Sequence, residues 1–163
     1  MDFIQHIDPA VFAPLILASA TVFTLFWGLD AATHAKLVHV DITDRELTTH
    51  RIILATSLVM VLSLVLMYWW PVAMLPVFFG SFVTRTVHEF LDELHYHMDR
   101  CTPYESMLHL LMWMAILTNT AAMFMWGFFT QFKGVETLHP VYYVWAGILA
   151  IAIVIISGKE WKR

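Results

Sequence analysis

The sequence has few charged residues, a single cysteine and no segment with the composition of a linker. Asp, Glu, Lys and Arg make up 13% of its 163 residues, whereas 60% are hydrophobic. Soluble domains have about a quarter charged residues, so this composition excludes an ordinary soluble protein. Because Cys101 is the only cysteine, an internal disulfide and a CxxC motif are both excluded. The formal net charge of -4 gives no basis for a nucleic-acid partner. We expect one integral membrane domain, 1–163.

Long apolar runs predict an all-α, polytopic helical bundle in the lipid bilayer. Several runs approach the roughly 20 residues that cross the hydrocarbon core as a helix. The five expected transmembrane segments are 11–28, 52–70, 72–87, 141–157 and, within a helix over 102–130, the part from about 110 to 129. Thr43 with Glu46, and Thr102 with Glu105, have the spacing of capping boxes, which predicts that helices begin at these two threonines.

The segment 72–87 is apolar only as far as Val83, and the distribution of basic residues decides whether it spans. If it spans, the N-terminus lies outside and the C-terminus is cytoplasmic. Of the nine Lys and Arg residues, only Lys133 then falls on the outer side. If it does not span, Arg85 and Arg100 face the opposite side from the basic C-terminal tail. We therefore expect five spans, in a bacterial inner (plasma) membrane.

Ionisable side chains are concentrated in the segment 85–109, which holds four of the nine histidines. Antiparallel helices joined by short turns allow their levels in the membrane to be compared. The turn near residue 101 places His109 level with about Leu94, and the turn at 70–72 places His50 level with Asp92. These positions lie close to the expected cytoplasmic boundary of the membrane.

The first and third expected helices bring further ionisable groups to this level. A span that starts at residue 11 places Asp30 at the same boundary and His34 one turn beyond it. At about 100° per residue, one stripe of the third helix carries Arg85, His88, Asp92, His95 and Asp99. His97 and Asp99 lie near the following turn, where we expect both side chains to be solvated.

Imidazoles and carboxylates at one level predict a metal site. Ionisable groups in hydrocarbon are costly unless they are paired, hydrated or bound to an ion. This ligand set suits iron, manganese or zinc, and helical bundles build such sites from inward-facing Glu and His. We predict one or two transition metal ions, with ligands from Asp30, His34, His50, His88, Glu89, Asp92, His95 and His109. Neither an HExxH motif nor a Glu-x-x-His pair occurs among the residues at this level, so they indicate no known family.

Three other interpretations compete with the metal site. A haem b between His50 and His109 is the weaker cofactor choice, because no small-residue groove is reserved for a porphyrin. The acidic, histidine-bearing face could instead be solvated, with Arg85 neutralising Glu89 or Asp92 across one turn. Proton or ion conduction is a third reading, but the outer halves of the expected spans lack ionisable residues.

Two main classes of function are compatible with these features. The first is a metal-dependent oxidoreductase, or a redox subunit, that acts on a lipid-soluble substrate such as a quinone or an acyl chain. The alternative is a non-catalytic accessory subunit of a larger membrane complex, or a homo-oligomer, that docks through its small-residue and aromatic helix faces. A metal or proton transporter is a second alternative.

Overall fold

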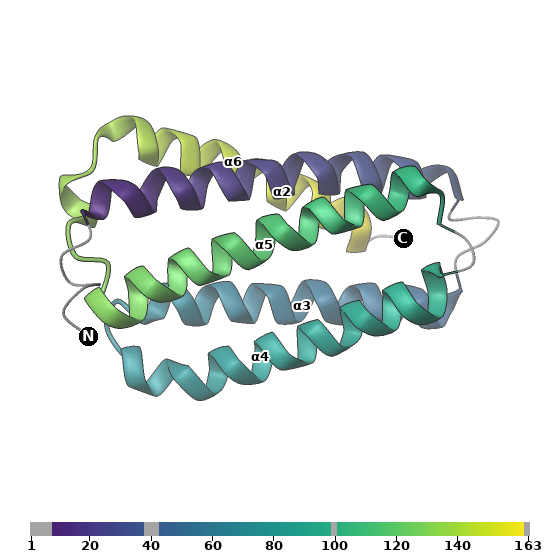
Figure 1. The fold of residues 1–163 in the computed structure, drawn as a ribbon, viewed down its shortest axis with the longest axis horizontal. Coiled ribbons are helices and arrows are strands. Elements are labelled where there is room, and N and C mark those ends of the chain that lie inside the picture. Colours follow the sequence, from purple (N-terminus) through teal and green to yellow (C-terminus); the bar gives the residue numbers. More distant parts are fainter. Residues whose placement is uncertain (1–7, 38–42, 99–100, 162–163) are drawn as a thin grey trace.

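Long helices lie side by side in the computed structural model, which describes residues 8–37, 43–98 and 101–161, and no strand occurs among them (Figure 1). The long helices are α2 (Pro9–Leu37), α3 (Asp44–Leu66), α4 (Pro71–Leu91), α5 (Pro103–Thr130) and α6 (Pro140–Trp161). A π-helical segment, η1 (Asp92–His97), continues α4, and a short 3₁₀ helix, η2 (Val135–Thr137), precedes α6.

Four of these helices are long and apolar enough to cross a membrane. The candidate spans are Val11–Ala32, Asp44–Leu66, Pro103–Thr130 and Pro140–Lys159. The predicted class of an all-α, integral membrane protein is therefore supported. Helix α4 is not among the four, because its last two turns include Arg85, His88 and Glu89.

Both predicted capping boxes are present. The hydroxyl of Thr43 accepts a hydrogen bond from the backbone N–H of Glu46, whose carboxylate accepts one from the backbone N–H of Thr43. Thr102 and Glu105 make the same reciprocal contacts. Each box satisfies N–H groups that a helix start otherwise leaves without partners. Helices α3 and α5 therefore begin at fixed positions at the same end of the bundle (Figure 1).

The helices pack mainly as two antiparallel pairs, α2 with α5 and α3 with α4, and α6 lies against α2 (Figure 1). The first pair is held by Phe12 stacked on Trp126, with ring centroids 5.9 Å apart. Asn119 of α5 donates to the backbone oxygen of Ile16 on α2, 2.8 Å away, and so adds a hydrogen bond between the two helices. A second apolar cluster joins α3 and α4 and consists of Met60, Leu64, Met67 and Phe78.

Candidate metal centre

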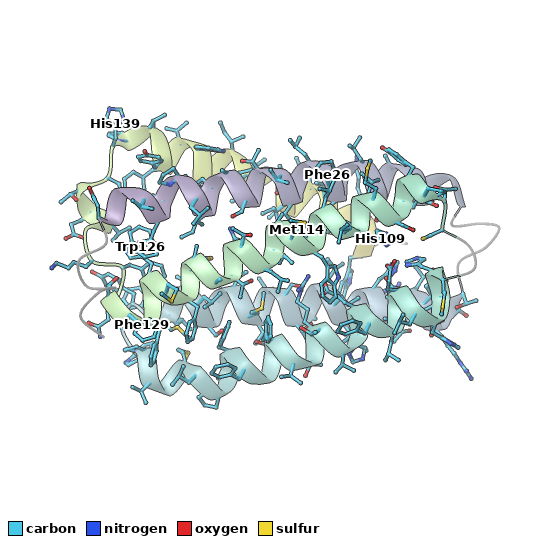
Figure 2. The ribbon with its side chains drawn as sticks, viewed as in Figure 1. Phe26, His109, Met114, Trp126, Phe129 and His139 are labelled. Atoms are coloured by element: carbon cyan, nitrogen blue, oxygen red, sulfur yellow. The ribbon has the colours of Figure 1, made fainter. Side chains whose placement is uncertain are left out.

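Seven ionisable side chains from four helices meet at one end of the bundle. They come from the C-terminal part of α2, the first two turns of α3, η1 and the second turn of α5. We call this set the polar layer; its members are Asp30, Glu46, His50, Asp92, Glu93, His97 and His109. Figure 2 shows His109 far from Trp126 and His139, which lie toward the opposite end.

Four members of the polar layer form a compact first group. Glu46, His50, Asp92 and His97 each offer a ligand atom, and these atoms all lie within 4.8 Å of one another. His50 Nε2 is 3.1 Å from Asp92 Oδ1, and His97 Nε2 is 3.5 Å from Glu46 Oε1. Two ligands about 2.1 Å from a tetrahedral ion are about 3.4 Å apart. The first group therefore has the dimensions of a metal site.

Glu46 serves the helix start and the first group with different oxygen atoms. Oε2 accepts from the backbone N–H of Thr43, whereas Oε1 faces His97. The residue is fully buried, at 0% exposure. Because the capping box fixes the side chain, the carboxylate is already oriented before any ion binds.

The π-helical segment η1 determines which side chains face the first group. In an α-helix, residues five apart point about 140° away from each other, at about 100° per residue. In a π-helix the backbone hydrogen bonds join residues five apart, so these residues lie over one another. Asp92 and His97 are five apart, and His97 Nδ1 lies 3.6 Å from Asp92 Oδ2. The change of helix type thus brings both side chains into one group.

His109 lies beside the first group and contacts a carboxylate through each ring nitrogen. Its Nδ1 is 2.7 Å from Glu93 Oε2, and its Nε2 is 3.2 Å from Asp30 Oδ1. The rings of His97 and His109 have centroids 4.9 Å apart. His97, Cys101 and His109 form a second group whose ligand atoms lie within 4.8 Å of one another.

Cys101 is half-buried between η1 and α5. Burial, together with the negative charges of Glu105, Glu93, Asp30 and Asp92, raises the pKa of its thiol to about 12. At neutral pH the thiol is therefore protonated. Thiolate is the form that binds a metal, so Cys101 becomes a ligand only where an ion displaces its proton.

A separate ion pair occupies the preceding turns of α4. The guanidinium of buried Arg85 pairs with Glu89 and also donates through Nε to Ser57 Oγ, 2.8 Å away on α3. Neutralisation of Glu89 by Arg85 is the interpretation that competed with a metal ligand at this position. Among the described residues, neither metal-binding group includes Glu89.

The predicted levels agree with the contacts in the polar layer. His109 meets Glu93, next to the expected Leu94, and His50 meets Asp92 as expected. Asp30 reaches the same level, where it contacts His109. Of the eight predicted ligands, the first group contains His50 and Asp92, and the second contains His109.

In the described part of the chain, neither group includes His88, Glu89 or His95. His88 Nδ1 donates to the backbone oxygen of Thr84 at 2.8 Å, and His95 is exposed beside Tyr96. The side chain of His34 falls outside the described residues. A role for these histidines as ligands stays a prediction.

The expectation that His97 is solvated is wrong, because the residue is only 4% exposed. The α-helical phase had placed His95 in the stripe with Asp92, whereas the π-helical segment turns His97 inward instead. Glu46 and Glu93 were also not among the predicted ligands. Their i, i+4 spacing to His50 and His97 is the signal in the sequence that points to them.

Comparisons with protein-family models, with curated proteins and with solved structures found no match to this chain.

Proposed function

We propose that this protein binds a divalent transition metal ion, namely iron, manganese or zinc, at the first group of the polar layer. The observation that supports the proposal most strongly is the convergence of Glu46, His50, Asp92 and His97, whose ligand atoms lie within 4.8 Å of one another. Two imidazoles and two carboxylates are a ligand set typical of these ions. Both helices that supply them are fixed locally, α3 by its capping box and η1 by its continuity with α4.

We further propose that the chain spans the membrane five times. In addition to the four candidate spans, α4 crosses the bilayer, the N-terminus lies outside and the polar layer lies at the cytoplasmic boundary. Helix α4 has 21 residues, a length of about 31 Å at 1.5 Å per residue, which matches the hydrocarbon core. It packs along α3, itself a candidate span. The basic residues favour this orientation, and a bacterial plasma membrane is the expected location.

A metal at this position favours a metal-dependent oxidoreductase, or a redox subunit, over a transporter. The polar layer lies close to the ends of three candidate spans, where a lipid-soluble substrate such as a quinone or an acyl chain has access from the bilayer. A bound transition metal would supply Lewis-acid or redox chemistry there. Toward the opposite end, the interior of the bundle is packed with apolar clusters, which do not suit a path for ions.

The accessory-subunit alternative rests on one feature, helix α6. It packs against α2 and exposes a face that includes Val144, Ile148, Ile151 and Val154. This face suits lipid, a second copy of the chain or another membrane subunit equally well, so it does not compete with metal binding.

Metal content decides the proposal. The full chain is purified in detergent without chelators, loaded with Mn(II), Fe(II) or Zn(II), and analysed by elemental mass spectrometry and by absorption spectroscopy, which also detects haem. We expect bound metal in the wild type, and a loss of at least tenfold in affinity in His50→Ala. His139→Ala, at the opposite end of the bundle, is the matched histidine control and should keep wild-type binding. A wild type without metal, or His50→Ala with undiminished affinity, would refute the proposal.

A further inference from the structure

The polar layer contains more ligands than one ion requires. A tetrahedral ion takes four protein ligands, and the first group supplies four. Asp30, Glu93 and His109 remain beside it, in contact with one another. We propose that the polar layer holds two metal ions, the first at the first group and the second at His109; this inference rests on the proposed function.

His109 has the surroundings of a metal-ligating imidazole. Metal-bound histidines use one ring nitrogen for the ion and donate the other ring N–H to a carboxylate, which fixes the orientation of the ring. His109 has Glu93 at one nitrogen and Asp30 at the other, at 2.7 Å and 3.2 Å. One of these carboxylates therefore orients the ring, and the other lies at the ring nitrogen that would bind the second ion, where it can serve as a further ligand.

Glu93 lies between the two proposed ions. Its Oε2 is 2.7 Å from His109 Nδ1 and 3.9 Å from His97 Nδ1, and His97 belongs to the first group. Ions that share a carboxylate in this way lie about 3.5–4 Å apart in two-metal sites. Asp92, the neighbouring residue on η1, already faces both His50 and His97. The neighbouring carboxylates of Asp92 and Glu93 thus bring the two proposed ion positions close enough for one carboxylate to bridge them.

The chemistry and origin of the ligands fit a two-metal centre in a helical bundle. Such centres take carboxylates and histidines from four helices around one axis. Here α2, α3, η1 and α5 each contribute, with four carboxylates and three imidazoles in total. The spacing differs from the Glu-x-x-His pattern because Glu46 and His50, like Glu93 and His97, are four residues apart.

The test is stoichiometry and magnetic coupling with Mn(II) as the probe. The full chain in detergent is dialysed to equilibrium against Mn(II), and bound metal per chain is measured by elemental analysis, followed by electron paramagnetic resonance. We expect two ions per chain with a spin-coupled signal. One ion per chain, or two ions without coupling, would overturn this inference and leave the proposed function intact, whereas no bound ion would overturn both.

A variant separates the two positions. His109→Gln should reduce the stoichiometry from two to one and abolish the coupling, while the ion at the first group remains. Helix content by circular dichroism and a monodisperse elution profile serve as the folding controls. Because the wild-type stoichiometry and coupling need no variant, they decide the inference even if His109→Gln fails to fold. Two coupled ions in a folded His109→Gln protein would contradict the assignment of the second ion to His109.

Discussion

The Arg85–Glu89 ion pair lies in the turns of α4 just before η1, and η1 contributes to the polar layer, yet the charges of the ion pair and of the polar layer are satisfied in different ways. In the first, a guanidinium that does not lose its proton neutralises the carboxylate. In the second, the described contacts join carboxylates to imidazoles, for example Asp92 to His50. An imidazole can release its proton and bind a metal ion. Of these two regions, the polar layer is therefore the one that can exchange protons for a metal ion.

This difference in how the charges are satisfied indicates a structural role for the Arg85–Glu89 pair and a functional role for the polar layer. The Arg85–Glu89 pair links α4 to α3 through Ser57 and needs nothing beyond the chain. The polar layer instead has the geometry to accept an external cation. Three predictions test this distinction, and they run from the largest expected effect to the smallest.

Replacing Arg85 with methionine should destabilise the fold more than the loss of either helix cap. Removing one partner of a buried ion pair costs about 3–5 kcal/mol, because the other charge stays buried, and Arg85 is only 4% exposed. The measurement is the free energy of unfolding in mixed detergent. Arg85→Met/Glu89→Met removes both charges and should recover at least half of the loss. A double variant as unstable as the single one would show that the ion pair is not the source of the effect.

Replacing His97 with alanine should weaken metal binding by about 100-fold or more, whereas His95→Ala should change it by less than about threefold. The expected contrast follows from η1, since His97 is buried at the first group and His95 is exposed. Metal affinity is measured by competition with a chromophoric chelator. Equal losses of metal affinity in the two variants would contradict the π-helical phase of η1. A larger loss in His95→Ala would instead support the α-helical phase, in which His95 lies on the same stripe as Asp92.

Removing the two helix caps should give the smallest and most selective effect. Thr43→Ala and Thr102→Ala should each lower the free energy of unfolding by about 1 kcal/mol. Thr43→Ala should in addition weaken metal binding a few-fold, because Glu46 uses one oxygen for the cap and the other for the first group. Thr102→Ala is the matched control, since Glu105 belongs to neither metal-binding group of the described residues. Identical affinities in the two variants would show that capping does not orient Glu46.

The sequence allowed the helices and their relative levels to be predicted because short turns and capping boxes have strict spacing. The start of α3 after Thr43 and the meeting of His50 with Asp92 both follow from such local rules. The α-helical phase failed beyond Asp92, because a π-helical segment adds residues to a turn without a distinctive residue pattern. His97 was expected in solvent because it lies near the following turn, whereas η1 turns it inward.

The candidate ligands were also harder to predict where one side chain has two roles. The capping box accounts for only one oxygen of Glu46, although both oxygens of a carboxylate can accept contacts, so the motif does not indicate the contact of its other oxygen with His97. Conversely, His88 lies on the predicted stripe of α4 but donates to its own helix backbone. Periodicity gives the direction of a side chain and not the partner that it finds there.

The division of the bundle into two helix pairs has a mechanical consequence. The first group lies entirely within the α3–α4–η1 unit, whereas His109 and Asp30 belong to the α2–α5 unit, and the His109–Glu93 contact bridges them. Ions bound on both sides of this boundary would add a removable connection between the two pairs, beside the His109–Glu93 contact and the apolar packing toward the opposite end. Chelation would then weaken the connection between the pairs at the polar layer and leave each pair intact.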